Sequence, residues 1–230
     1  MSTKIEKILL KGVYALNRVI PKKQNQIFFY SSPDYSDSAR ALFEEMQREG
    51  LVGKYSVVWA VKDIKGFQNT EYVKFVRHRS LKNLWNFCRS RYLVRTHSLW
   101  GNRYVQGKQV MCVAWHGMPL KHLVSPDNVQ RHTVKADYVT TTSEVFHKEF
   151  IASMGIRNDI CMEKGLPRND YLFSGKKIPE ILFPGYDHYI IWMPTFRKAA
   201  GFQDGCEGEL GIPILTGGNL KNLNAELQKK

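Results

Sequence analysis

Apolar residues follow two alternating patterns through most of the chain. Short runs of β-branched, aromatic and aliphatic residues alternate with stretches in which apolar positions recur at helical spacing. The runs predict strands at 26–31, 55–61, 73–75, 92–96, 109–114, 138–142 and 160–163. The helical spacing predicts helices at 38–49, 80–88 and 147–154. Strands that alternate with helices predict an α/β fold with a Rossmann-like parallel sheet covered on both faces.

A further helix is predicted at residues 4–20, with an apolar stripe and a basic flank. The cations on that flank include Lys4, Lys7, Lys11 and Arg18. A basic amphipathic helix can lie in the interface of an anionic membrane leaflet, where each lysine contributes on the order of 1 kcal/mol. The same stripe also suits a helix that packs on its own domain. The sequence leaves both alternatives open.

A domain boundary is predicted between residues 173 and 185, where glycine and proline interrupt the apolar pattern. Residues 1–174 then form one domain. Residues 185–230 begin a second one, with a strand at 189–193 and a helix near the end. One strand and one helix cannot bury a core of their own. We therefore expect this second domain to be incomplete, or to dock on the first.

Charge and cysteine content narrow the classes of partner. The formal net charge of +13 indicates a membrane surface, a nucleic acid or a phosphate-rich substrate. No zinc-finger spacing or RNP-like aromatic motif is present, so no nucleic acid is predicted as a partner. The 4 cysteines lie far apart without metal-ligand spacing, which predicts reduced thiols and no metal site. No apolar run reaches about 20 residues and no signal-peptide cleavage site is visible, so we expect an intracellular protein.

The candidate catalytic residue is a histidine at the exit of a buried strand. His116 follows the strand predicted at 109–114, with Gly117 beside it and Pro119 and Lys121 shortly after it. In parallel sheets, catalytic and ligand-binding residues gather at the carboxyl ends of the strands. Histidine titrates near neutrality and can take a proton from an attacking hydroxyl. A histidine in this place can also be purely structural, and the motif alone does not decide between the roles.

A second cluster follows the last strand of the predicted sheet. Its arginine, Arg168, offers a rigid fork suited to phosphate. Asn169 and Asp170 can cap the helix that follows. A turn with an incidental arginine is the alternative interpretation.

Two further segments carry hydroxyl groups near strand ends. Thr195 and Arg197 lie two positions apart, so both can point at one phosphate from an extended loop. Ser143 ends a hydroxyl-rich strand and is expected mainly to cap the helix that starts near Val145, with a substrate contact as its second role.

In this order the segments resemble the motifs of the CDP-glycerol glycerophosphotransferase family, whose members build teichoic-acid-type polyol-phosphate polymers. The similar segments are Trp115–Lys121, Thr141–Glu144, Gly165–Asp170 and Pro194–Arg197. Motifs in register across most of a chain are more specific than any one of them alone. Met118 departs from the pattern, because the family often has threonine or serine at this position.

The resemblance implies a GT-B type architecture, with a membrane-facing, acceptor-side first domain. It implies that a hydroxyl of a lipid-linked acceptor attacks the β-phosphorus of CDP-glycerol, or of a related CDP-polyol, and releases CMP. The step would take place at the cytoplasmic face of the membrane, in teichoic acid or capsule-type polymer synthesis. His116 would be the base, and Arg168 and Arg197 would contact the pyrophosphate. The implied substrate-binding residues also include Gly117, Pro119, Lys121, Ser143, Asn169, Asp170 and Thr195.

Two later family motifs have no counterpart in these residues: a second histidine-proline motif and a serine-rich segment that help to hold the nucleotide. We therefore expect most of the donor-binding domain to be missing and the chain to be weakly active or inactive by itself. The alternative function is a truncated, non-catalytic module that binds the membrane surface or the acceptor. No cofactor is implied, although Mg²⁺ could accompany the nucleotide phosphates.

Overall fold

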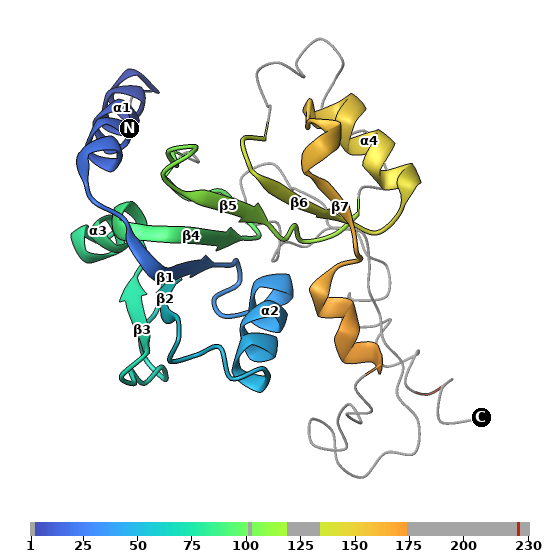
Figure 1. Ribbon diagram of the computed structural model, residues 1–230, viewed down its shortest axis with the longest axis horizontal. Coiled ribbons are helices and arrows are strands. Elements are labelled where there is room, and N and C mark those ends of the chain that lie inside the picture. The colour runs from blue at the N-terminus through green and yellow to red at the C-terminus, as the bar shows by residue number, and fades with distance from the viewer. Residues whose placement is uncertain (1–2, 101–102, 119–133, 174–224, 226–230) are drawn as a thin grey trace. The chain divides into compact units, whose positions relative to one another are not determined.

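A computed structural model describes residues 3–100, 103–118, 134–173 and 225 of the chain (Figure 1). Its elements, in chain order, are α1 (Thr3–Val19), β1 (Lys23–Tyr30), α2 (Asp37–Arg48), β2 (Ser56–Val61), β3 (Val73–Arg77), α3 (Leu81–Arg89), β4 (Ser90–Arg95), β5 (Val110–Val113), β6 (Tyr138–Thr141), α4 (Glu144–Met154), η3 (Asn158–Ile160), β7 (Cys161–Glu163) and η4 (Pro167–Phe173). The predicted succession of strands and helices is confirmed, with ends that differ by a few residues.

The strands form one parallel sheet in the order β3-β2-β1-β4-β5-β6-β7 within the described residues. This confirms the predicted α/β, Rossmann-like fold. Strand β1 pairs with β2 on one side and with β4 on the other, so the strand order reverses beside β1. Since all strands run the same way, their carboxyl ends meet at one edge of the sheet. Open α/β sheets bind ligands at this edge, at the point where the order reverses.

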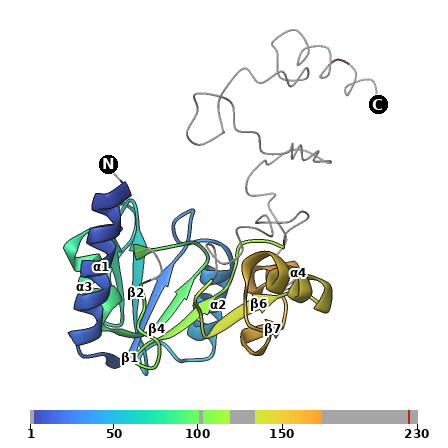
Figure 2. The ribbon, with the colours of Figure 1, turned by 90° about the horizontal axis from the view of Figure 1, so that it is seen from above.

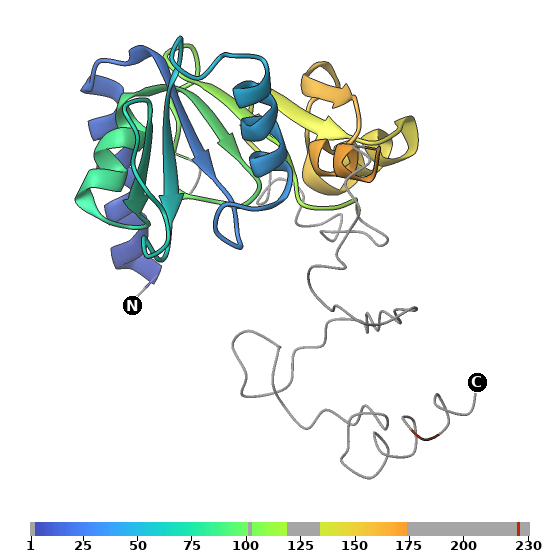
Figure 3. The same ribbon diagram turned by 90° about the horizontal axis from the view of Figure 1, so that it is seen from below.

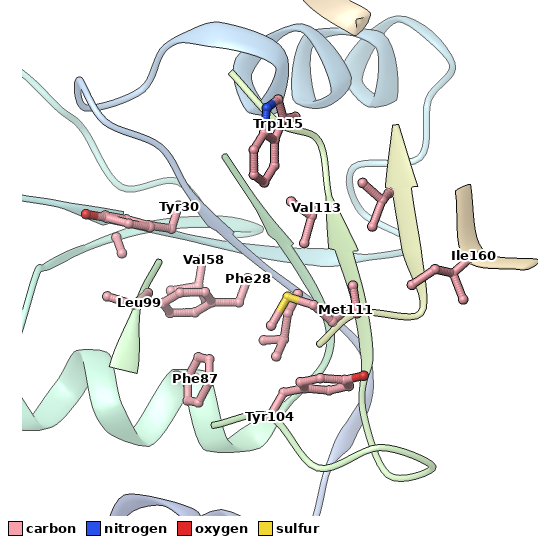
Figure 4. Packing of buried hydrophobic residues seen from close by; sticks show 14 of the residues in the cluster. Phe28, Tyr30, Val58, Phe87, Leu99, Tyr104, Met111, Val113, Trp115 and Ile160 are labelled. Atoms are coloured by element: carbon pink, nitrogen blue, oxygen red, sulfur yellow. The ribbon is translucent and has the colours of Figure 1, made fainter. Parts of the chain in front are cut away.

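Strand β1 is buried on both faces because its apolar residues alternate between two cores. Phe28 and Tyr30 belong to the core on the side of α1 and α3, where Phe28 packs edge-on against Phe87 of α3 (Figure 4). Ile27 and Phe29 belong to the core beneath α2. Figures 2 and 3 show α2 on the face of the sheet opposite α1 and α3. This two-sided burial is the reason why the last four residues of the strand, 27–30, form an unbroken apolar run.

Aromatic packing fixes α2 on the sheet. The rings of Phe29 and Trp59 stack with centroids 4.9 Å apart, and Phe43 of α2 meets Trp59 edge-on at 5.8 Å. Trp59 and Phe43 are almost completely buried. Such ring pairs contribute about 0.5–1.5 kcal/mol beyond their burial. Because α2 is held in this way, its first residue, Asp37, has a fixed position at the carboxyl edge of β1.

Helix α1 packs on the domain through one narrow side. Val13, Asn17 and Ile20 are buried. The amide nitrogen of Asn17 donates hydrogen bonds to the Arg103 carbonyl at 2.8 Å and to Gln109 Oε1 at 2.7 Å. The sequence did not mark Asn17 as an anchor, because a polar residue in the helix gives no signal until its partners are known.

The rest of the predicted apolar stripe of α1 lies in solvent. Four of its side chains are between 41% and 75% exposed: Ile8, Leu9, Leu16 and Val19. Lys11 and Arg18 are exposed on the same helix, and Lys4 and Lys7 belong to its first turns. The packing alternative is therefore confirmed for one side of the helix, and contact of the exposed side with a membrane stays a prediction. None of the helices in the described ranges is long and apolar enough to cross a membrane.

The predicted boundary between residues 173 and 185 and the predicted second domain at 185–230 fall almost entirely outside the described residues. The domain division stays a prediction.

Candidate active site

His116 lies where the carboxyl ends of β4 and β5 meet. The strand ladder continues to this point, because the Ala114 amide donates to the Arg95 carbonyl at 2.9 Å. Trp115, at the end of β5 (Figure 4), then takes a left-handed backbone conformation with φ 46°. Non-glycine residues in this conformation are strained and concentrate at functional sites. The turn leaves the His116 side chain exposed at the sheet edge.

One hydrogen bond sets the protonation pattern of the His116 ring. Its Nδ1 lies 3.0 Å from the carbonyl oxygen of Thr96, the first residue after β4. A carbonyl oxygen only accepts, so Nδ1 carries the hydrogen. In the neutral ring the lone pair is then on Nε2. The position of Thr96 thus prepares His116 to accept a proton at Nε2.

Gly117 brings the two main sequence motifs together. Its φ of 154° lies outside the range that other residues readily adopt, and a Cβ built on it would be 3.6 Å from Nη2 of Arg168. A side chain at this position would therefore be strained by the backbone conformation, and its Cβ would be in van der Waals contact with the guanidinium of Arg168. The structure thus brings together Gly117 and Arg168, which the sequence placed in two separate motifs.

Asp37 holds the guanidinium of Arg168. Nη1 of Arg168 lies 3.2 Å from Oδ1 of Asp37, which also accepts a hydrogen bond from the Ser38 amide at 2.8 Å. The Asp37 side chain is 9% exposed and that of Arg168 is 40% exposed. A buried carboxylate thus orients a half-exposed cation, whose remaining N–H groups can meet an anion. Asp37 has φ 62°, a conformation that aspartate tolerates better than most residues.

The segment that carries Arg168 is fastened to α2. The Tyr171 hydroxyl donates to Glu44 Oε2 at 2.9 Å, and the Arg40 Nε donates to Glu44 Oε1 at 2.7 Å. Burial, followed by the hydrogen bond to Glu44, raises the pKa of Tyr171 to about 12. Tyr171 therefore stays a hydrogen-bond donor at neutral pH, and Arg168 keeps its place beside Gly117.

The predicted capping role of Asn169 and Asp170 is wrong. Helix η4 already begins at Pro167, so both residues lie inside it, and both are exposed. Proline favours the first turn of a helix because its missing N–H would have no helical partner there. Whether Asn169 and Asp170 contact substrate stays a prediction.

The predicted capping hydrogen bond of Ser143 is also wrong. Ser143 occupies the N-cap position of α4, but its side chain makes no capping hydrogen bond. Its backbone is extended, with φ −165° and ψ 167°, as is usual at an N-cap. Ser143 is half-buried. Its predicted contact with substrate is not affected by this correction.

His97 and Asp37 complete the site, and the sequence interpretation missed both. The His97 ring stacks on the His116 ring with centroids 4.3 Å apart and 18° between their planes. Its Nδ1 lies 2.9 Å from the Thr96 hydroxyl. Burial, followed by the nearby charge of His116, lowers the pKa of His97. His97 directly follows the strand predicted at 92–96, and His116 comes two residues after the strand predicted at 109–114, so the same rule could have found His97.

Four predicted site residues lie outside the described residues: Pro119, Lys121, Thr195 and Arg197. In the ranges that are described, no group of three or more histidine, cysteine, aspartate and glutamate side chains is placed to hold a metal ion. Cys88, Cys112 and Cys161 are free thiols.

Comparison with known proteins agrees with the resemblance found in the motifs. The chain is 27% identical to the teichoic acid poly(glycerol phosphate) polymerase of Bacillus spizizenii, over 84% of this chain and 55% of that protein. It is 23% identical to the teichoic acid glycerol-phosphate transferase of Staphylococcus aureus, over 87% of this chain and 58% of that protein. The chain thus spans a little over half the length of these curated relatives.

Solved structures show the same fold. The wall teichoic acid polymerase TagF superimposes with a TM-score of 0.59 at 22% identity, over 74% of this chain and 46% of that one. A TagF variant soaked with CDPG gives the same TM-score at 21% identity, over 74% of this chain and 48% of the variant. The family model described as CDP-glycerol:poly(glycerophosphate) glycerophosphotransferase matches residues 12–212. The chain therefore belongs to the CDP-glycerol:poly(glycerophosphate) glycerophosphotransferase family.

Proposed function

We propose that the protein transfers glycerol phosphate from CDP-glycerol to a hydroxyl group of a lipid-linked acceptor in teichoic acid synthesis. The observation that carries this proposal is the arrangement around Gly117. An exposed histidine with its lone pair on Nε2 lies on one side, and an arginine oriented by a buried carboxylate lies on the other. A proton acceptor and an anion-binding group in one place are what phosphoryl transfer to a hydroxyl requires.

In the proposed step, the acceptor hydroxyl oxygen attacks the β-phosphorus of CDP-glycerol. A new P–O bond forms to the acceptor, and the bond from the β-phosphorus to the bridging oxygen breaks. The electron pair of that bond leaves with CMP. His116 Nε2 takes the hydroxyl proton, and its Nδ1–H stays on the Thr96 carbonyl throughout. The imidazolium formed is returned to its neutral state by loss of the proton to solvent.

Arg168 has an electrostatic role in this proposal. Negative charge on the phosphoryl oxygens and on the leaving CMP must be stabilised as the bonds change. The Asp37 contact occupies Nη1, and Nη2 lies toward Gly117. The N–H groups on the Gly117 side are those that would meet the pyrophosphate. Mg²⁺ bound to the nucleotide phosphates would add to this charge stabilisation without a dedicated protein site.

The proposal is tested by calorimetric titration of this chain with CDP-glycerol, CDP-ribitol and CMP. We expect saturable binding of CDP-glycerol that is tighter than that of CMP, because CMP lacks the β-phosphate that Arg168 would contact. The Arg168→Ala variant should lose this preference. If CDP-glycerol did not bind, or bound no better than CMP, the donor contact proposed for Arg168 would be wrong. In that case the chain would supply only the acceptor and membrane side of the reaction.

We further propose that α1 faces an anionic membrane surface as a peripheral contact at its cytoplasmic side. The exposed apolar residues of α1 lie beside the exposed cations Lys11 and Arg18. A basic pocket of about 450 Å³ continues this surface past the end of the helix, and its lining includes Lys22, Arg91 and Lys108 but no acidic residue. Apolar side chains with flanking positive charge are typical of helices in the membrane interface. A lipid-linked acceptor, in teichoic acid or in capsule-type polymers, would reach the site from such a surface.

Liposome flotation tests the membrane contact. The double variant Lys11→Glu/Arg18→Glu should bind vesicles with anionic lipid at least about 30-fold more weakly, since each cation near the surface contributes about 1 kcal/mol. Lys65→Glu/Lys74→Glu is the control, because it makes the same change in net charge at two exposed lysines on other elements. Equal loss in both variants would mean that only the total charge matters, and α1 would then have no special role.

A further inference from the structure

His97 is a second histidine at the candidate site, and the proposed reaction assigns no role to it. It follows β4 as His116 follows β5, and the two strands are neighbours in the sheet. The rings are nearly parallel at 4.3 Å between centroids, and the Trp115 ring is nearly parallel to that of His116 at 5.1 Å. An exposed catalytic side chain with parallel rings beside it has fewer orientations open to it than an isolated one.

Thr96 contacts both histidines through hydrogen bonds. The Thr96 carbonyl oxygen lies 3.0 Å from His116 Nδ1, and the Thr96 hydroxyl lies 2.9 Å from His97 Nδ1. Thr96 is buried and is fixed to β1, because its amide donates to the Tyr30 carbonyl at 3.1 Å. The His97 ring therefore has a fixed position, and the His116 ring can stack on it.

The charges around His97 keep its ring neutral. Burial lowers the pKa of His97 most, electrostatic interactions with His116, Arg95 and Lys62 lower it further, and Asp37 acts in the opposite direction. Arg95 is 5% exposed, and burial lowers its pKa to about 10, so it remains charged at neutral pH. Arg168, on the far side of Gly117, adds a further positive charge near His116. A neutral ring is the better neighbour for a base that must itself become positive.

We propose that His97 is a positioning residue for the transfer reaction: its neutral ring stacks on His116, keeps Nδ1 of His116 on the Thr96 carbonyl, and supports the imidazolium that forms when Nε2 takes the acceptor proton. This inference rests on the proposed function of His116. An aromatic face attracts a cation placed over it, so the stack is stronger after proton transfer than before it. His97 thereby favours the transition state over the ground state.

The test compares two substitutions of His97 in the same protein. His97→Phe keeps an uncharged ring, and His97→Ala removes it. We expect His97→Ala to lower kcat by about threefold to tenfold, the range that corresponds to one aromatic stacking contact, with little change in the KM for CDP-glycerol. His97→Phe should stay within about twofold of wild type on the same scale. His78→Ala is the control, because His78 also stacks on a ring at a strand end, that of Tyr30 at 5.1 Å, and should leave kcat unchanged.

Nitrogen-15 NMR of the His116 ring provides a readout that does not depend on transfer. In wild type and His97→Phe the shifts should report a hydrogen on Nδ1, and in His97→Ala they should report a mixture of tautomers. A His97→Ala protein with the wild-type tautomer and unchanged kcat would overturn the inference, as would a Phe variant as defective as the Ala variant. If the tautomer changes as expected but His116→Ala still transfers, then the positioning is correct and the proposed role of His116 is wrong.

Discussion

Replacement of His116 by alanine is expected to lower the rate of glycerol-phosphate transfer by about 10²–10⁴-fold, the usual contribution of a general base. The reason is structural as well as chemical. The Thr96 carbonyl fixes the hydrogen on Nδ1, so Nε2 is the atom that can accept the proton of the acceptor hydroxyl. Alanine offers no proton acceptor at this place. The measurement is the initial rate of incorporation of labelled glycerol phosphate from CDP-glycerol into a lipid-linked acceptor, made with a version of the protein that spans the full length of the curated relatives.

The fold should survive this change, because the His116 side chain is exposed and contributes little to the core. Melting temperatures of variant and wild type should therefore agree closely. His147→Ala serves as the matched histidine control, since His147 pairs with Glu163 at 2.5 Å and has no role in the proposed reaction, so the variant should keep its activity. A His116→Ala protein that transfers within tenfold of wild type would rule out His116 as the base.

Arg168→Ala is expected to lower kcat/KM by about 10²–10³-fold, as is usual when one preorganised donor to developing negative charge is removed. Arg168→Lys should recover only part of this loss, because an ammonium group cannot contact Asp37 and a phosphate with the same planar fork. The effect on stability should be small, about 1 kcal/mol or less, since the guanidinium is 40% exposed and its pairing with Asp37 is screened by solvent. Steady-state kinetics and thermal denaturation separate the two effects.

A double-mutant cycle shows whether Asp37 acts through Arg168. Asp37→Asn keeps an acceptor for the Ser38 amide and tolerates the φ of 62°, but it loses the negative charge that orients Arg168. If Asp37 acts only by holding Arg168, the loss from Asp37→Asn should largely disappear when Arg168 is already alanine. Additive losses would instead give Asp37 an independent role in the reaction.

The succession of strands and helices was predictable because each element has its own periodicity. The run at 27–30 is apolar at every position because β1 is buried on both faces, and this pattern is local. Helix caps were less predictable. Ser143 and Asn169 have side chains typical of caps, but Ser143 makes no capping hydrogen bond and η4 already begins at Pro167, before Asn169.

The motifs of the candidate site could be predicted from the sequence, but the contacts between their side chains could not. His116, Gly117 and Arg168 were found because each follows a predicted strand and because their order matches a known family. Asp37 was missed because its function depends on Arg168, which lies 3.2 Å away in space and far along the chain. The stripe on α1 was visible in the sequence, but which of its residues pack was decided by Asn17 and its distant partners.

The sequence by itself determined the α/β class and the family, and it predicted His116 as the base, because periodicity and short motifs are properties of neighbouring residues. Only the tertiary structure decided that Thr96 fixes the tautomer of His116, that Asp37 orients Arg168, and that His97 stacks on His116. These relations depend on the strand order, which places the ends of β1, β4 and β5 side by side. Strand order arises from the packing of the whole sheet, so no local pattern carries it.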